Sequence, residues 1–373
     1  MGIMNKFLSM FGGSKKEPIP QKLTTSNKEK PLFSNGERDK FIETIAVNQL
    51  NALIDASDQP SDFFFMVTNR NLYLSISNEV VNHIMNFRGI VGVQPMHGPC
   101  TLAYRLVISH PAASNDLATT WGNGVSISAE LISVPVKADT HRLKTTISPT
   151  LIEDLKRADD VNTIVSKIAY EVALEIYNNI ITDLLKIAAS SLKIIKRRMD
   201  DTEYLHSKHA LSAINNAANE IARATRRGLG NFIVCSPSSL LALHRYFAVA
   251  NISYNTTCVN VPFDDYNSSH AMNIVGVDGC IMYRVYVSDV INAENAHRFL
   301  IGYNGAGSTD SGYIHCPYVP IMTYNRNWAV GDAISNASRY GTVHDLQVDD
   351  YSNSKNYYRI VDVDPYNCEP IVK

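Results

Sequence analysis

The side chains that could do chemistry are spread along this chain, and few stand at a spacing that chemistry requires. His206 and His209, with Glu203 nearby, come closest to a metal-binding group. A stable site needs a further ligand at helical spacing, so we interpret these residues as a solvated helix face. Gly302–Gly307 (Gly-Tyr-Asn-Gly-Ala-Gly) resembles a phosphate-binding loop, but no Gly-Lys-Ser/Thr follows it, which favours ordinary turn glycines.

The potential nucleophiles are equally isolated. His315 and Cys316 are adjacent, and adjacent residues of a strand point to opposite faces, so they cannot readily act as a thiolate pair. Ser236 lies in Cys-Ser-Pro-Ser and not in a Gly-x-Ser-x-Gly turn. The carboxylates Asp264 and Asp265 have polar neighbours that would not raise a pKa. We therefore expect no catalytic residue, no cofactor and no bound metal, and we expect that the protein is not an enzyme.

Six widely separated cysteines, most of them in apolar runs, indicate small buried side chains in a reducing cytoplasm. They are Cys100, Cys235, Cys258, Cys280, Cys316 and Cys368. The 373 residues, 45% of them hydrophobic, are enough for two or three packed subdomains. The chain has 34 basic and 36 acidic residues, and a protein whose main task is to wrap nucleic acid would be far more basic. No apolar run approaches the roughly 18 residues of a membrane span, so we expect a soluble or assembled cytoplasmic product.

Two segments lack the means to bury their own apolar side chains. In residues 1–40, Ile3, Phe7 and Phe11 can form one stripe, but the Lys/Glu/Pro/Ser-rich run that follows has no core-forming period. Residues 102–109 and 125–136 predict two strands of a hairpin joined by a polar loop. A lone hairpin is marginal in water, and its edges invite pairing with another chain. We expect both segments to contact neighbouring subunits, through Ile3, Phe7, Phe11, Trp121, Val125 and Ile127.

The remaining pattern mixes long helices with short strands. Apolar residues recur at three- and four-residue steps over residues 160–190, which predicts a helix of roughly 43 Å at ~1.5 Å per residue. A coiled coil is the alternative, but the stripe is wider than a coiled-coil seam. Further helices are predicted over 41–60, 204–227 (ending at a Gly228 cap) and 237–247, and residues 63–76 fit a strand or a short helix. Strands are predicted at 231–236, 272–277, 281–287, 299–303 and 356–363.

Basic residues are concentrated between Lys186 and Arg227. They fit solvated helix ends, and they also fit a weak, salt-dependent attraction to DNA or to acidic neighbours.

Two segments have unusual sequences, Gly92–Pro99 (Gly-Val-Gln-Pro-Met-His-Gly-Pro) and Cys316–Pro320 (Cys-Pro-Tyr-Val-Pro). They resemble the most specific blocks of the major capsid protein family of T-even-like tailed phages. Weaker similarities to the same family, in matching order, are Arg226–Cys235, Ser338–Gly341 and Tyr357–Arg359. Residues 110–124 leave no room for the extra hairpin domain of larger members.

The resemblance implies an α+β chain of the Hong-Kong-97 type, with an N-terminal arm, an extended hairpin loop, a peripheral domain with a long spine helix, and an axial domain. The implied domains are an arm at 1–40, a peripheral domain at 41–100, 148–227 (spine helix about 160–190) and 336–373, a hairpin loop at 101–147, and an axial domain at 228–335.

The function implied is that of a major head protein, which self-assembles as hexamers and pentamers into an icosahedral shell around double-stranded DNA. Its implied partners are copies of itself, portal, scaffolding and decoration proteins, and DNA through weak contacts; it would lie in the virion after assembly in the host cytoplasm. An encapsulin-like compartment of the same fold is one alternative. An α/β enzyme using residues 302–320 is another.

Overall fold

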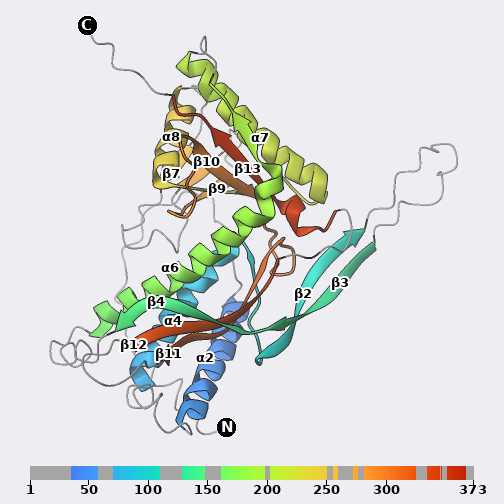
Figure 1. The fold of residues 1–373 in the computed structure, drawn as a ribbon. Coiled ribbons are helices and arrows are strands. Elements are labelled where there is room, and N and C mark those ends of the chain that lie inside the picture. The colour runs from blue at the N-terminus through green and yellow to red at the C-terminus, as the bar shows by residue number, and fades with distance from the viewer. Residues whose placement is uncertain are drawn as a thin grey trace, which may run out of the picture. The chain divides into compact units, whose positions relative to one another are not determined.

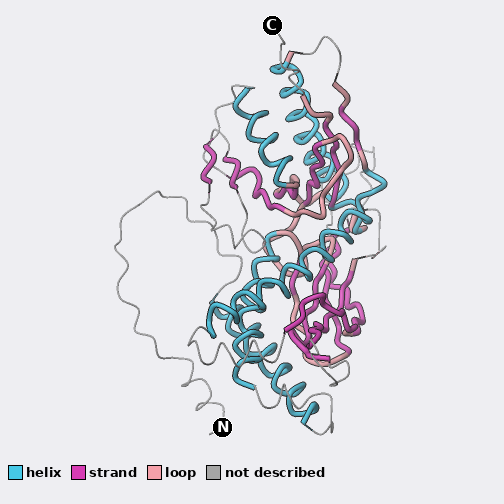
Figure 2. Tube along the Cα trace, turned by 60° about the vertical axis from the view of Figure 1, so that its left-hand side comes forward, coloured by secondary structure: helices cyan, strands magenta, loops and turns pink. Residues whose placement is uncertain are grey.

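The computed structural model describes residues 35–57, 70–109, 128–147, 161–197, 202–249, 255–258, 272–275, 281–324, 334–344, 346 and 351–366 (Figures 1 and 2). Within these ranges the strands form three sheets, of four, seven and two strands. Helices of 13 to 28 residues pack against the two larger sheets.

The four-stranded sheet joins segments that are far apart in the sequence. Its strand order is β1-β11-β12-β4, with β1 parallel to β11 and the other neighbours antiparallel. The strands are β1 (Gly92–Val93), β4 (Asp139–Ile147), β11 (Ile314–Tyr324) and β12 (Ile334–Val343).

The seven-stranded sheet has the order β5-β13-β10-β6-β9-β8-β7. The pairs β5–β13 and β6–β9 are parallel, and the other neighbours are antiparallel. The strands are β5 (Lys193–Ile195), β6 (Phe232–Cys235), β7 (Asn255–Cys258), β8 (Met272–Val275), β9 (Ile281–Val287), β10 (His297–Gly302) and β13 (Tyr358–Val363).

The two-stranded sheet is the hairpin of β2 (Cys100–Ser109) and β3 (Ser128–Lys137), which pair from Cys100 opposite Lys137 to Ser109 opposite Ser128. The helices are α2 (Asn35–Ser57), α4 (Arg70–Asn86), α6 (Val161–Ala188), α7 (Glu203–Thr225) and α8 (Pro237–Val249), with short 3-10 turns at Phe87–Gly89, Ala189–Ser191 and Ser354–Tyr357. None of the described helices is both long enough and apolar enough to cross a membrane.

The long helix α6 is the element that unites the larger hydrophobic core. Its buried side chains include Val172, Ile176, Ile180 and Leu184, each about one turn from the next on the face that the sequence predicts. They share a core cluster with residues of α2, α4 and both large sheets. A second cluster lies between α7, α8 and the seven-stranded sheet. The helix predicted over 160–190 is confirmed at Val161–Ala188.

Several other sequence-based expectations meet a definite outcome. The hairpin strands and the helices at 204–227 and 237–247 are confirmed within a few residues. The undecided segment 63–76 is helical from Arg70 onward, as part of α4. Helix α2 begins at Asn35 and not at residue 41, because its first turn is polar and exposed and gives no apolar period. The boundaries of the domains stay a prediction.

Two features differ from the elements predicted from the sequence. Gly92 and Val93, which lie outside every predicted strand, pair with β11. Helix α7 ends at Thr225 with Arg226 in the left-handed region (φ 53°), so Gly228 is not its cap. Glycine is needed at 228 for another reason, since a Cβ there would lie 2.7 Å from the ring of Tyr303.

The long strands β11 and β12 escaped prediction because prolines interrupt the first of them. Pro317 and Pro320 lack the N–H that a central strand needs. The β11–β12 register shifts between Pro317 and Val319 and again between Val319 and Met322, so both prolines lie at irregularities. At the second shift the amide of Gln49 takes the place of a strand partner. Its Nε2 donates to the carbonyl of Ile321 (2.9 Å), and its Oε1 accepts from the Ile321 N–H (3.3 Å).

Replacing Gln49 with leucine should reduce the free energy of unfolding by about 1–3 kcal/mol, because both backbone groups of Ile321 would stay buried without a partner. Denaturant unfolding of the full-length chain measures this loss. Asn51→Leu on the exposed side of α2 is the matched control, with an expected change within about 0.5 kcal/mol. Equal losses for the two variants would contradict the assigned role of Gln49.

Candidate assembly interface

The hairpin presents two unlike faces. On the inner face Ala103, Arg105, Val107 and Val136 are buried, and Ala103 and Val136 join a small apolar cluster with Met96 and Cys316. On the outer face the side chains of Leu102, Tyr104 and Leu131 are 51%, 43% and 54% exposed. The alternation follows from the two-residue period of a strand.

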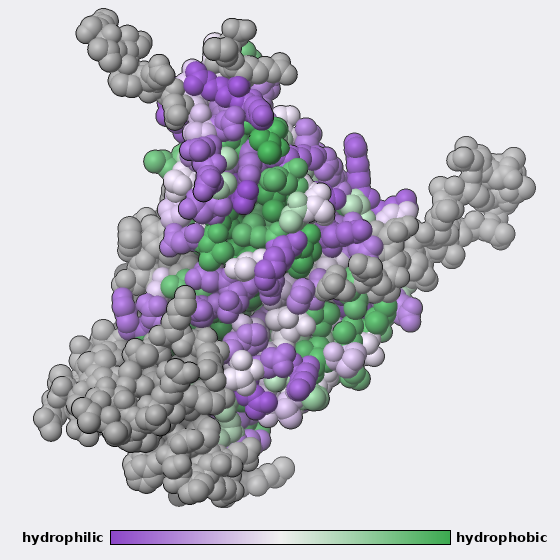
Figure 3. All heavy atoms as spheres, viewed as in Figure 1, coloured by the Kyte–Doolittle hydropathy of each residue, from purple (hydrophilic) through white to green (hydrophobic). Residues whose placement is uncertain are grey.

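The outer face is apolar over several residue pairs. Leu106 lies opposite Leu131, Tyr104 opposite Ser133 and Leu102 opposite Pro135, and these six residues are called the outer face below. Figure 3 shows hydrophobic side chains gathered over the hairpin. An apolar patch of this kind on a ribbon is typical of a surface that another protein covers.

The side chain of Gln94 fixes the root of the hairpin from one side. Its Oε1 accepts from the Tyr104 N–H (2.8 Å), while its Nε2 donates to the Tyr104 carbonyl (2.6 Å) and to the Ser308 carbonyl (3.1 Å). The amide therefore replaces a neighbouring strand at the open edge of β2. This contact gives a physical reason for a glutamine in the Gly-Val-Gln-Pro-Met segment.

Arg227, in the turn after α7, fixes the root one residue pair further along. The Leu106 N–H donates to the Thr309 carbonyl (3.0 Å), and the Leu106 carbonyl accepts from Arg227 Nη2 (2.6 Å). Arg227 also forms an ion pair with Asp310, and its side chain is only 3% exposed. Both backbone groups of Leu106 are thus held by the body of the protein.

A second buried guanidinium secures the inner face. Arg105 is fully buried, donates to Ser354 Oγ (2.9 Å) and to the Ser352 carbonyl, and lies 5.2 Å from the centre of the Tyr357 ring. Arg227 lies over the same ring at 5.5 Å. Burial is the main cause that raises the pKa of Tyr357, so its hydroxyl stays protonated and the ring serves as a neutral platform for both cations.

The contact residues predicted from the sequence lie outside the described residues. Ile3, Phe7, Phe11, Trp121, Val125 and Ile127 all fall in undescribed ranges, so their role stays a prediction. The residues that sequence reasoning missed are those of the root. An arginine at 105 among the apolar residues of a strand was the available signal, because a charge on a buried face requires partners.

The residues weighed for chemistry do not form a catalytic group. His206 is fully buried and its Nε2 lies 2.9 Å from the Asp364 carbonyl, so the expectation of a solvated helix face is wrong for it; His209 is exposed. The two are three residues apart on α7 and therefore neighbours on the helix, but only His206 lies in the core. In the described part of the chain, no three metal-binding side chains come together. Burial raises the pKa of the Cys316 thiol to about 12, which excludes a thiolate there at neutral pH.

Two smaller expectations concern the cysteines and the basic residues. Cys235 and Cys316 are buried as predicted, but Cys100 is exposed. Several basic residues between Lys186 and Arg227 have acidic partners: Lys186 with Asp183, Lys193 with Glu220, and Arg227 with Asp310. These pairs favour neutralised helix ends over a continuous basic surface.

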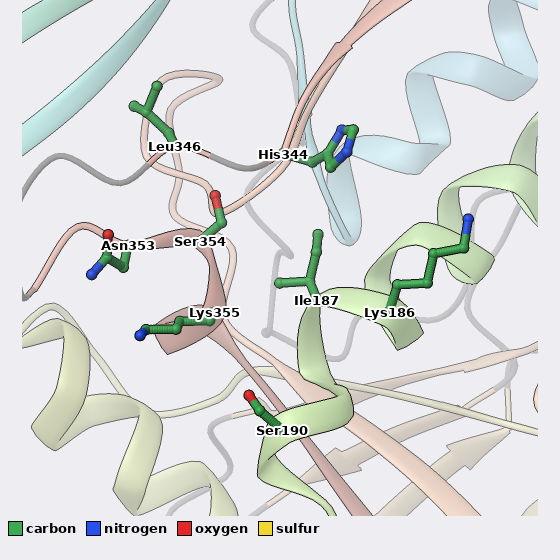
Figure 4. Close-up of a pocket in the computed structure, with 8 residues that line it drawn as sticks. All are labelled: Lys186, Ile187, Ser190, His344, Leu346, Asn353, Ser354 and Lys355. Atoms are coloured by element: carbon green, nitrogen blue, oxygen red, sulfur yellow. The ribbon is translucent and has the colours of Figure 1, made fainter.

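A pocket of about 340 Å³ lies near the end of α6 (Figure 4). The ammonium groups of Lys186 and Lys355 point in different directions in this view, and Lys186 pairs with Asp183 at 3.0 Å. The residues that line the pocket are Lys186, Ile187, Ser190, His344, Leu346, Asn353, Ser354 and Lys355. The pocket has no convergent acid, base and nucleophile of the kind that catalysis requires.

A chain with a firmly anchored hairpin and an uncovered apolar face has the features of an assembling structural protein. Comparison with protein families identifies the class, because the family model of the major capsid protein Gp23 matches residues 111–363, more than half of the chain. The chain belongs to this family of phage major capsid proteins. The resemblance found in the sequence is confirmed, and with the hairpin, α6 and the two large sheets it establishes the Hong-Kong-97-type α+β fold.

Individual relatives are distant. The major capsid protein of Enterobacteria phage T6 is 29% identical over 139 residues, which are 33% of this chain and 26% of that protein. The major capsid protein of Vibrio phage KVP40 is 30% identical over 114 residues, 31% of this chain and 21% of that protein. The chain thus spans about a quarter or less of the length of these curated relatives.

Solved structures with a similar backbone include a chain of Mycobacterium phage Adephagia, with a TM-score of 0.41 and 12% identity over 77% of this chain and 91% of that chain. Another is the virus-like particle from Pyrococcus furiosus, with a TM-score of 0.39 and 13% identity over 78% of this chain and 99% of that chain.

Asp310→Asn should lower the free energy of unfolding by about 2–3 kcal/mol, because the buried Arg227 would lose its counter-charge. Glu203→Gln is the matched control. Its partner Arg245 is 50% exposed, so the expected loss is about 1 kcal/mol or less. A loss for Asp310→Asn as small as that of the control, in denaturant unfolding, would show that the root does not depend on this ion pair.

Gln94→Ala should loosen the hairpin at Tyr104 without unfolding the protein. Loss of one backbone hydrogen bond, worth about 1 kcal/mol, should speed exchange of the Tyr104 amide hydrogen about fivefold. Hydrogen exchange measured by NMR or mass spectrometry tests this. His97→Ala, an exposed position in the same loop, should leave that rate unchanged. An unchanged rate in Gln94→Ala as well would rule out the clamp.

Proposed function

We propose that this chain is the shell subunit of a tailed phage head, assembling as hexamers and pentamers into an icosahedral particle around double-stranded DNA. The observation that carries the proposal is the outer face of the hairpin. It is largely apolar, its root is fixed by Gln94, Arg105 and Arg227, and Leu102 and Leu131 are half exposed in the single chain. Membership of the Gp23 family supports the same reading.

The partner of the outer face in this proposal is a second copy of the chain. Burying one exposed leucine contributes about 1.5–3 kcal/mol. A closed lattice repeats the same contact at every subunit, so contacts that are individually weak give a stable particle. Portal, scaffolding and decoration proteins would be further partners, and the location would be the virion after assembly in the host cytoplasm.

A structural role without enzymatic activity is part of the proposal. The described residues contain no metal-binding cluster, and the histidines and thiols weighed above are isolated or buried as uncharged groups. Contact with packaged DNA would be weak and salt-dependent, because the formal net charge is only −2 and several basic side chains have acidic partners.

The double variant Leu102→Ser with Leu131→Ser should fold normally and assemble poorly. Loss of even about 1.4 kcal/mol per contact raises the protein concentration required for assembly about tenfold. Light scattering and electron microscopy of the purified full-length protein measure assembly, and circular dichroism reports the fold.

The control variant is Leu241→Ser, which removes the most exposed large hydrophobic side chain among the described residues (73%), on helix α8. It should assemble like the wild type. Shells of normal yield and stability from the hairpin double variant would refute the proposed role of the outer face. Particles that enclose protein cargo and no DNA when isolated from cells would refute the phage-head reading.

A further inference from the structure

A row of three aromatic rings crosses the four-stranded sheet beside the hairpin. Register places Tyr340 of β12 opposite Asp139 and Pro317, and His141 of β4 opposite Ser338, while His315 of β11 lies opposite Thr342. Residues two apart on a strand share a face, so His141, Tyr340 and His315 lie on one face, with the tyrosine in the middle.

The three rings are in close contact. The His141 ring is stacked on the Tyr340 ring, with centroids 3.8 Å apart and planes 10° from parallel. The His315 ring is tilted against the same tyrosine at 4.8 Å. The Tyr340 hydroxyl accepts a hydrogen bond from Asn179 of α6 (3.2 Å), which ties the row to the long helix.

The environment of His315 suits a neutral imidazole only. The side chain is fully buried, and neither of its ring nitrogens has a hydrogen-bond partner. A protonated ring would carry two N–H donors and a positive charge into a fully buried site in which neither nitrogen has an acceptor. Strand β4 follows directly after β3, so any opening of the β4–β12 pair releases one side of the hairpin root.

The charged groups around the row have different effects on the pKa values of its three side chains. Asp139 of β4 and Asp183 of α6 both raise the pKa of His141, but burial outweighs them and lowers it. Burial, reinforced by the positive charge of His141, lowers the pKa of His315 to about 3. Burial and, to a smaller extent, the charge of Glu175 of α6 raise the pKa of Tyr340. The ring of His344 is stacked on that of Tyr313, with centroids 5.7 Å apart.

The other elements packed on β11 add apolar side chains to the same core, including Phe41 and Ile45 of α2, Val80 and Ile84 of α4, and Val93 of β1.

We propose that the row His141–Tyr340–His315 is an acid-sensitive latch, which holds β4 and the hairpin root on the sheet at neutral pH and releases them when the histidines take up protons. The release itself is a property of the single chain. Its consequence, acid-induced loosening of a shell, rests on the function proposed above.

The direction of the pH effect follows from the binding of protons. The exposed imidazole of the open form has a pKa near 6.5, and that of His315 in the closed form is far lower, so the open form binds protons more tightly. The closed form is therefore fully favoured above about pH 6.5. For each pH unit below this, the equilibrium constant for opening rises about tenfold per histidine, down to the pKa of the closed form.

Hydrogen exchange of the β4 and β12 amides in the full-length protein, corrected for intrinsic exchange rates, tests the latch between pH 7 and pH 4.5. From His315 alone, the opening constant of the wild type should rise about 50-fold between pH 6.5 and 4.5, and proton uptake by His141 adds to this rise. In His315→Leu it should rise far less, and His141→Phe, which keeps a stacking ring, should reduce the rise as well. His209→Leu, at an exposed position on α7, should behave like the wild type.

A flat profile in the wild type, or a His315→Leu profile that matches it, would overturn the latch. If His315→Leu does not fold at pH 7, the His141→Phe profile decides the question in the same way. Light scattering of assembled particles over the same pH range reports the effect on shells. Because exchange is read on the chain itself, failure to assemble would count against the proposed function and leave the test of the latch intact.

Discussion

An isolated two-stranded ribbon must be held in place by the body from which it projects. The hydrogen bond from Arg227 to the Leu106 carbonyl meets this constraint, with Asp310 neutralising the guanidinium. Gln94 does the same at Tyr104, and Arg105 holds the inner face on Ser352 and Ser354. Since a hairpin alone is marginal in water, these contacts let the ribbon keep an apolar face directed away from its own core.

The root can hold the hairpin because α6 packs against both large sheets and makes the surrounding part of the protein one core. Side chains of this helix share one core cluster with Phe232 and Leu300 of the seven-stranded sheet and with Ile321 and Tyr340 of the four-stranded sheet. Close-packed interiors move as units and do not deform continuously, so the helix couples both sheets to the hairpin root. Polar contacts to α6, such as the hydrogen bond from Asn179 to Tyr340, fix the orientation of the side chains that pack there. In a shell, force on one hairpin would thus be carried into the body of the subunit.

Sequence patterns predicted the elements whose period is regular, and they failed where side chains replace backbone partners. The 28 residues of α6 and the alternating strands of the hairpin were predictable because burial imposes a fixed period on them. Strand β11 was not, since Pro317 and Pro320 look like strand breakers until Gln49 is known to pair with Ile321. The root was not predictable either. Its residues, Gln94, Arg105, Arg227 and Asp310, are far apart in sequence and meet only through the fold.

We propose that an adjacent copy of the chain covers the outer face of the hairpin. The most direct measurement is a high-resolution electron cryomicroscopy structure of assembled particles, with the exposure of Leu102, Tyr104 and Leu131 compared with the values of 51%, 43% and 54% in the single chain. We expect these side chains to be buried against a neighbouring subunit while the Gln94 and Arg227 contacts persist. Finding the three side chains still exposed in the particle, or folded onto their own chain, would contradict the claim.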